Sequence, residues 1–326
     1  MTQSEEGRAL RFADDLLVRA ATLYYLQDAT QAQVAAALGT SRPTVSRLLA
    51  EARARGIVHI EVRDPGSTDD AELQHRLAET LGLVRAWITS ASGPQPSGAV
   101  LAPAVTEALR DADLRRGDAV LISSGATIYA VAQQNLPALP GVVMAPTVGG
   151  QDEPEAYYQT NEITRQFAAK CQAQPMFLYA PAMPGPELHD HLVADPSVTP
   201  VLQLWRRARC AVLGIGGPPA TRTSLPSVLP TDPEFLRVAA GDVASRPFDA
   251  AGQPLEFPGS DRLVAIELAA LRHIPSTIGV AVGREKVRSI LAAARAGYIN
   301  RLVTDRDTAQ ALLDASDAHP EESLEG

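Results

Sequence analysis

The feature of this 326-residue chain that most constrains its fold is an alternation of short apolar runs with segments of helical periodicity. The apolar runs predict strands at 84–89, 119–123, 141–146, 176–181, 210–217, 277–283 and 301–304. The helical spacing predicts helices at 71–81, 100–111, 127–134, 161–171, 285–296 and 306–315. Strands that are apolar throughout and separated by helices are typical of a parallel sheet covered on both faces, so we predict a Rossmann-like α/β domain.

The residues before this alternation have the pattern of a helix-turn-helix. Helical spacing over 14–27 is followed by a short helix that Thr30 can cap, and then by a helix that Ser41 can cap and that runs to about Arg55. The alternating segment "IVHIEV" (57–62) predicts the strand of a wing. We therefore predict an N-terminal winged helix-turn-helix, in preference to a helical hairpin that docks on another domain.

Such a motif inserts the N-terminal turn of its second helix into the major groove, where Arg can bridge guanine and hydroxyls can bond phosphates or bases. The predicted DNA-binding residues are Thr30, Gln31, Ser41, Arg42, Pro43, Thr44, Ser46 and Arg47.

The charge distribution agrees with DNA binding, although the whole chain has a net charge of −9. Residues 1–64 contain eight Arg and eight Asp or Glu, so the negative charge lies in the rest of the chain. An acidic body repels DNA while a basic helix binds it. We therefore expect modest affinity per subunit, and binding of double-stranded operator DNA by a homodimer or homotetramer.

The expected organisation is a DNA-binding domain at 1–63, a polar linker at 64–70, a larger domain at 71–316 and a disordered acidic tail at 317–326. No apolar run is long enough to span a membrane and the acidic N-terminus is unlike a secretory signal, so we expect a cytoplasmic protein. Cys171 and Cys210 are expected to be buried, inert thiols. We expect no cofactor. We also expect no metal, because His189 and His191 would diverge on a helix and could act as a pair only if that stretch were a loop or a strand.

The stretch "VLISSGATIYAVAQ" has the order strand, small-residue loop, helix that suits anion binding. Backbone amides of Ser123, Ser124, Gly125, Ala126 and Thr127 could approach a phosphate closely, and the following helix would add the positive end of its dipole. The same composition also suits a plain turn, so the loop alone does not decide between the two.

Several ordered segments resemble the SorC family of sugar-binding transcriptional regulators over about residues 12–315. These are "TQAQVAAALGTSRPTVSRLLAEARARGIVHIEV", "VVMAPTVGG" with "YQTNEITRQFA", "VLGIGG", "AAGDVASRPFDAAGQPL" and "GREKVRSILAAARAGYINRLVTDRDTAQALL". The resemblance implies an effector domain related in fold to phosphosugar isomerases and deaminases. It also implies a phosphorylated sugar as effector. The sequence departs from the family pattern at Ala126, where a larger polar donor is usual, and at Pro247.

Carried onto this sequence, the resemblance implies particular binding residues. The phosphate would lie on Ser123–Thr127 and Lys286, and the sugar would contact Gly150, Gln151, Gln159, Asn161 and Asp242, with Arg246 as a weaker candidate. Three of these residues have simpler alternatives: Asn161 as a helix cap, Asp242 as a turn carboxylate and Lys286 as a solvated lysine.

The expected function is control of operator affinity by a phosphorylated sugar, in a regulator of carbohydrate metabolism. The six histidines form no catalytic constellation, and we assign no catalytic residue. Two alternatives stay open: a phosphosugar isomerase or deaminase with a DNA-binding extension, and an architectural regulator that senses no ligand.

Overall fold

The computed structural model describes residues 12–58, 68–89, 98–222 and 225–318. The chain separates into two compact units, Met1–Pro65 and Gly66–Gly326. Each unit has its own hydrophobic core, and each is described by itself below.

The described part of the N-terminal unit, residues 12–58, contains three α-helices around a small apolar core. Helix α1 (Asp14–Ala21) continues into a π-helical turn (Thr22–Leu26), and α2 (Gln31–Ala37) and α3 (Arg42–Ala54) follow. Thr30 caps α2 as expected and forms a capping box with Gln33, and the Ser41 hydroxyl accepts from the amide of Thr44 at the start of α3. The predicted helix-turn-helix is therefore confirmed. Ile57 and Val58 form a bend, and the rest of the predicted wing strand lies outside the described residues.

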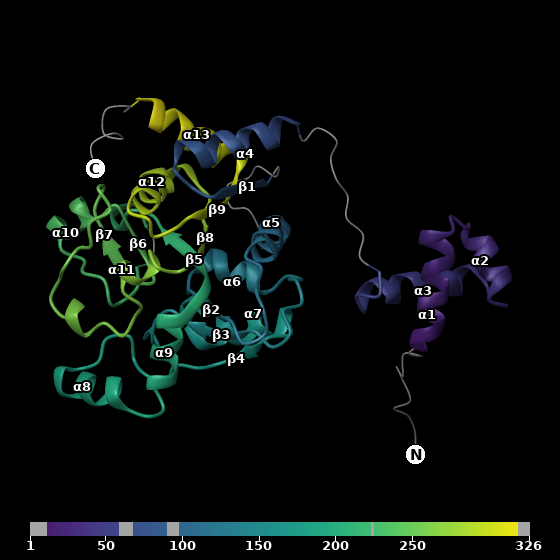
Figure 1. Cartoon of the computed structure of the whole chain (residues 1–326), viewed down its shortest axis with the longest axis horizontal. Coiled ribbons are helices and arrows are strands. Elements are labelled where there is room, and N and C mark those ends of the chain that lie inside the picture. Colours follow the sequence, from purple (N-terminus) through teal and green to yellow (C-terminus); the bar gives the residue numbers. More distant parts are fainter. Residues whose placement is uncertain (1–11, 59–67, 90–97, 223–224, 319–326) are drawn as a thin grey trace, which may run out of the picture. The chain divides into compact units, whose positions relative to one another are not determined.

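The larger unit is built on a parallel sheet, as predicted. Its strands are β1 (Arg85–Thr89), β2 (Ala119–Ile122), β3 (Val143–Pro146), β4 (Gln174–Pro175), β5 (Ala208–Gly216), β8 (Ser276–Val280) and β9 (Arg301–Asp305). They lie in the order β1-β9-β8-β5-β2-β3-β4, and all these neighbours pair in parallel (Figure 1). A short antiparallel hairpin, β6 (Gly241–Val243) and β7 (Arg246–Phe248), pairs with the end of β5.

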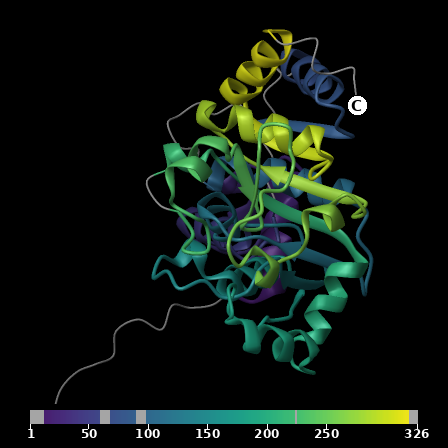
Figure 2. The same cartoon turned by 90° about the vertical axis from the view of Figure 1, so that its left-hand side faces the viewer.

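Helices cover both faces of this sheet, which explains why its strands are apolar throughout. On one face, Leu121 and Leu213 pack in the core that also contains α4 (Thr68–Thr80), α9 (Thr199–Arg207), α12 (Val287–Arg295) and α13 (Arg306–Ala318). On the other face, Val120 and Val212 pack in the core with α5 (Gly98–Asp111), α6 (Ala126–Ala132) and α7 (Thr160–Lys170). Helices α4 and α13 lie side by side in both views (Figures 1 and 2). The smaller helices α8 (Pro186–Ala194), α10 (Pro233–Val238) and α11 (Leu268–Leu271) lie in the connections.

The prediction of a strand at 176–181 is wrong. Strand β4 covers only Gln174–Pro175, and the next pairing contact is a hydrogen bond from the amide of Met176 to the carbonyl of Met144 (2.7 Å). Strand β3 then ends at Pro146, which has no amide proton and whose carbonyl accepts from Nε1 of Trp205 (2.8 Å). The partner strand therefore offers no further ladder, and the apolar run continues as irregular chain.

Two expected boundaries also need correction. Helix α4 begins at Thr68 and not at Ala71, so the last part of the predicted linker 64–70 is helical. Asp70 lies in its first turn, where a carboxylate favours the helix dipole, and it accepts from Arg306 (2.8 Å). Helix α13 runs to Ala318, so the first two residues of the predicted tail 317–326 are helical, and the others lie outside the described residues.

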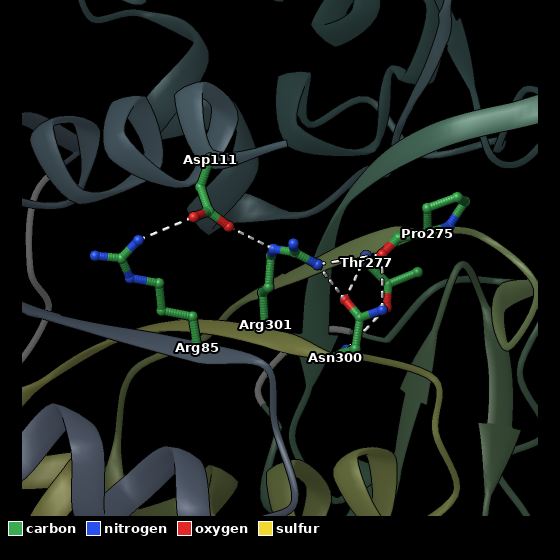
Figure 3. A network of polar contacts seen from close by, with 6 residues as sticks. All are labelled: Arg85, Asp111, Pro275, Thr277, Asn300 and Arg301. Atoms are coloured by element: carbon green, nitrogen blue, oxygen red, sulfur yellow. Dashed lines mark hydrogen bonds and ion pairs between the residues drawn. The ribbon is translucent and has the colours of Figure 1, made fainter. Parts of the chain in front are cut away.

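A polar network joins α5 to the β1–β9 edge of the sheet (Figure 3). The Asp111 carboxylate at the end of α5 accepts from Arg85 on β1 (2.9 Å) and from Arg301 on β9 (3.0 Å). Arg301 also donates to Asn300, whose side chain accepts from the amide of Thr277 (2.9 Å). Burial raises the pKa of Asp111, but its bonds to Arg301 and Arg85 outweigh burial and lower it. The carboxylate therefore stabilises the fold in its ionised form.

Replacing Asp111 with Asn should lower the free energy of unfolding by about 1 kcal/mol near neutral pH. Because the folded pKa is below the ordinary value of 3.8, this contribution is fully present above that pH and is lost as the pH falls through the folded pKa. Urea denaturation between pH 7 and pH 3 measures both effects. The control is Asp113→Asn, since the Asp113–Arg115 pair is exposed and should contribute nothing measurable. An Asp111 variant as stable as the wild type would contradict this role.

Candidate functional site

The sheet reverses its winding direction between β2 and β5. From β2 the chain continues outward to β3 and β4, whereas from β5 it continues to β8 and β9 on the opposite side (Figure 1). In an open parallel sheet, the crevice at the carboxyl ends of two such strands is the usual ligand site, because the following loops part there. The loop after β2 and the glycine-rich end of β5 meet at this point.

A cavity of about 570 Å³ opens at this reversal. The loop after β2 contributes Ser124, Gly125, Ala126 and Thr127, and the end of β5 contributes Gly214–Gly217. The remaining lining includes Tyr157, Arg222, Asp242, Ser245, Glu285 and Lys286. Five of the six predicted phosphate-binding residues therefore lie together in one cavity, with Ser123 as the exception.

Ser123 is held inside the fold and does not line the cavity. Its hydroxyl donates to the carbonyl of Ser124 (3.0 Å) and accepts from the amide of Gly214 (2.8 Å), and its exposure is 2%. The amide of Gly125 is also engaged, since it donates to the carbonyl of Tyr157 (2.8 Å). Gly125 has φ +119°, a conformation that favours glycine, and α6 begins directly after it. The donors on offer are therefore the first-turn amides of α6 and the hydroxyls of Ser124 and Thr127.

Lys286 reaches the cavity from the other side of β5. It lies in the 3₁₀ turn Arg284–Lys286 that precedes α12. Its side chain passes close to Gly217, because a Cβ added to Gly217 would lie 3.4 Å from Cγ of Lys286. Burial has the largest effect on the pKa of Lys286 and holds it below its ordinary value. Of the neighbouring charges, Glu285 and Asp242 raise this pKa and Arg222 lowers it. A half-buried ammonium of this kind gains from a bound anion, because the anion compensates the lost hydration. Lys286 is not a freely solvated lysine.

Asp242 forms a nearly buried ion pair with Arg222, with Nη1 of Arg222 2.6 Å from Oδ1 of Asp242. The side chains are 11% and 22% exposed respectively, so the pair is largely shielded from solvent. Gly216 makes room for it: a Cβ there would collide with Oδ1 of Asp242 and lie 2.8 Å from Nη1 of Arg222. Asp242 lies in strand β6, so it is not a turn carboxylate.

Gln151 lies behind two hydroxyls of the cavity wall. Its Nε2 donates to Oγ of Ser245 (2.9 Å) and to Oγ of Ser124 (3.4 Å), while its buried Oε1 has no hydrogen-bond partner among the described residues. Ser245 and its neighbour Ala244 form the β6–β7 turn with φ values of 61° and 53°. Left-handed conformations cost free energy for these residue types, so the surrounding contacts must hold the turn in place.

The other predicted sugar-binding residues lie elsewhere. Gly150, Gln159 and Asn161 line a separate hollow of about 320 Å³ together with Phe177 and Tyr179. The Asn161 side chain donates to the carbonyl of Leu178 (3.1 Å) and accepts from its amide (2.9 Å). Asn161 therefore clamps the irregular chain after β4, and it is not a helix cap, because Gln159 occupies the N-cap position of α7.

Arg246, the weaker candidate, has a structural role. Its guanidinium donates to the carbonyls of Ile266 (2.9 Å), Leu263 (3.1 Å) and Ala265 (3.1 Å), and it pairs with Glu267. It lines a hollow different from the one that contains Lys286.

Sequence reasoning did not find Arg222, Ser245 or Tyr157. Arg222 lies in a proline-rich loop of a chain with many arginines, so its residue type carries no signal. Ser245 acquires its position only through the β6–β7 turn, and Tyr157 contributes a backbone carbonyl. Only the run Gly214-Ile215-Gly216-Gly217 could have indicated that side chains from elsewhere approach β5 closely.

The N-terminal unit presents a basic face on α3. Val45, Leu48 and Leu49 are buried, whereas Arg42, Ser46 and Arg47 are exposed. Within the described part of the chain, no hydrogen bond or ion pair engages Arg42 or Arg47, so both guanidinium groups are available. Of the remaining predicted DNA-binding residues, Thr30, Ser41 and Pro43 are exposed and Gln31 and Thr44 half-buried.

Arg55, the C-cap residue of α3, differs from the arginines within this helix, because it pairs with Asp14 (2.7 Å) and with Glu51. Its charge is thereby neutralised, and it ties α3 to α1.

Cys171 and Cys210 are buried free thiols, and burial raises the pKa of each to about 12. Within the described ranges, no group of three or more His, Cys, Asp or Glu residues could hold a metal ion. No described helix is both long enough and apolar enough to cross a membrane.

Comparison with known proteins decides the family. A family model for a sugar-binding domain matches residues 67–314, and a model for a Crp-like helix-turn-helix domain matches residues 11–67. The chain belongs to the SorC family of sugar-binding transcriptional regulators.

Individual relatives of this SorC-family chain extend over nearly its whole length. It is 33% identical to the sorbitol operon regulator of Klebsiella pneumoniae, over 91% of this chain and 97% of the relative. It is 32% identical to the deoxyribonucleoside regulator of Bacillus subtilis, over 93% and 98% respectively. The crystal structure of full-length SorC from Klebsiella pneumoniae matches with a TM-score of 0.72 and 31% identity, covering 93% of this chain and all of that one.

Gly216→Ala should displace the Asp242–Arg222 pair and lower the free energy of unfolding by about 1–3 kcal/mol, because a Cβ at this position collides with both side chains. Chemical denaturation compared with the wild type measures the loss. Gly217→Ala is the matched control, since its Cβ would make only ordinary contacts, 3.4 Å or longer. Equal stability of the two variants would show that Gly216 is not needed for the pair.

Proposed function

We propose that this SorC-family regulator binds operator DNA through α3 and that a phosphorylated sugar in the cavity between β2 and β5 changes its affinity for that DNA. The observation that carries the proposal is the convergence of Lys286 with the Ser124–Thr127 loop at the reversal of the sheet. A half-buried cation facing small residues and free helix amides suits a phosphate. The exposed side chains of Arg42 and Arg47 on α3 support the DNA-binding part of the proposal.

Within this proposal, the phosphate lies on Ser124, Gly125, Ala126, Thr127 and Lys286. Ala126 supplies only its backbone, so the phosphate depends on amides, two hydroxyls and one ammonium. The sugar hydroxyls face Asp242, with Gln151 supporting the wall through Ser245 and Ser124. Gly150, Gln159 and Asn161 shape the neighbouring loop and do not contact the ligand.

Regulation requires a ligand that binds one arrangement of the protein better than another, since only differential affinity shifts an equilibrium. A single helix-turn-helix contacts few bases, so we propose that a homodimer or homotetramer reads paired half-sites. Because its target is chromosomal DNA, we propose that the protein acts in the cytoplasm.

We further propose that the protein is a sensor and not an isomerase or deaminase. An isomerase needs a base and a proton relay next to the sugar. Among the described lining residues no histidine occurs, and of the two lining carboxylates Asp242 is engaged with Arg222 and Glu285 is exposed. The regulator names of the relatives support the same proposal. Turnover of a bound sugar phosphate, followed by NMR over hours, would contradict it.

Lys286→Met should weaken binding of sugar monophosphates by about tenfold or more, because Met keeps the length of the side chain and removes its charge. The measurement is a thermal-shift titration followed by calorimetry, with tetrose, pentose and hexose monophosphates and their unphosphorylated parents. Lys170→Met is the matched control, since Lys170 is the only other lysine of the chain and is exposed on α7. Wild-type protein that binds none of the phosphates, or binds the parents as tightly, would contradict the phosphorylated effector.

Arg42→Ala and Arg47→Ala should each weaken operator binding by about tenfold or more, because an Arg contact with a base contributes about 1–3 kcal/mol. The measurement is a gel shift at fixed salt, with a DNA fragment selected by the protein from a random pool. Arg53→Ala removes the same charge from the last turn of the same helix, and it should have a smaller effect. Equal losses for all three variants would indicate general charge attraction instead of groove recognition.

A further inference from the structure

The charged groups of the effector cavity balance one another. Its described lining contains two cations, Arg222 and Lys286, and two carboxylates, Asp242 and Glu285. All four interact, since Glu285, Arg222 and Asp242 each affect the ionisation of Lys286. A phosphate monoester carries about 1.5 to 2 negative charges at neutral pH. The negative charge of one phosphate group is therefore already larger than the single positive charge of the Lys286 ammonium that it contacts.

The second cation is not available to a second phosphate. Nη1 of Arg222 is 2.6 Å from Oδ1 of Asp242, and Gly216 leaves the space in which the two side chains meet. Breaking a shielded ion pair leaves one charge buried without compensation, which is strongly unfavourable. An anion that approached Arg222 would also meet the Asp242 carboxylate directly.

The same pair is well suited to hydroxyl groups. An ionised carboxylate only accepts hydrogen bonds and has several acceptor positions, of which Arg222 occupies one. A guanidinium only donates and has further N–H groups beyond the one directed at Asp242. A hydroxyl both donates and accepts, so neighbouring hydroxyls of a sugar or polyol can satisfy both members of the pair. A dianionic phosphate has no proton to donate to Asp242.

We infer that this cavity selects sugars and polyols that carry a single phosphate, with the Asp242–Arg222 pair binding free hydroxyls and rejecting a second phosphate. The inference rests on the proposed function, because it assumes that Lys286 and the Ser124–Thr127 loop hold the first phosphate.

Calorimetry on the full-length protein tests the inference with matched ligands. The probes are the monophosphates of fructose and ribulose and their bisphosphates, together with inorganic phosphate. The expected result is that at least one monophosphate binds about tenfold or more tightly than the bisphosphate of the same sugar. If a bisphosphate binds as tightly as its monophosphate, the inference is overturned while the proposed function stands. If no phosphate ester binds, the proposed function fails and the inference fails with it.

Asp242→Asn identifies the group responsible. The amide keeps an acceptor for Arg222 and removes the negative charge. The ratio of the Kd of the bisphosphate to the Kd of the monophosphate should therefore fall by about tenfold. Asp261→Asn is the matched control, because Asp261 is exposed and lies outside this cavity. A melting temperature for each variant shows that it is folded. A folded Asp242 variant with the wild-type preference would overturn the role of Asp242, and the wild-type comparison remains decisive if that variant does not fold.

Discussion

The burial of a parallel sheet on both faces is the constraint on which the larger unit depends. Buried amides and carbonyls must be paired, so strands that are covered by helices on both sides can end only where the chain returns to solvent. Several groups of the cavity lie at such ends: Ser124–Thr127 after β2, Gly216 at the end of β5 and Lys286 after β8. Asp242 is added by the hairpin strand β6, which pairs with the end of β5. The reversal between β2 and β5 then separates the loops enough to admit a ligand.

Periodicity predicted most of the fold because it records burial directly. Val120 and Leu121 face different cores, so the run around them is apolar at every position, and the same holds for β5. Periodicity failed where hydrogen bonding decided instead. Residues 176–181 are as apolar as a strand, but the partner strand ends at Pro146. That limit depends on which strand lies alongside, and no local pattern contains this information.

The site was predictable to the extent that it lies within one segment or at a family motif. Sequence reasoning placed Ser124–Thr127 and Lys286 in the cavity, but it also included Ser123, whose hydroxyl is used within the sheet. It could not find Arg222, because the significance of that residue depends on Asp242, which lies on another element. Gln159 and Asn161 lie at the start of α7 and line a different hollow. Long-range pairing thus limits what a single sequence can reveal.

The hydrogen bond from Trp205 to the end of β3 makes this tryptophan an intrinsic fluorescence probe. The chain has two tryptophans: Trp87 lies on the edge strand β1, and Trp205 bonds to the carbonyl of Pro146. Pro146 leads into the loop that carries Gln151, and Gln151 supports two hydroxyls of the cavity wall, so the indole of Trp205 is bonded to the start of that loop. Its emission will report changes in this loop, while Trp87, on the opposite edge of the sheet, provides an internal reference.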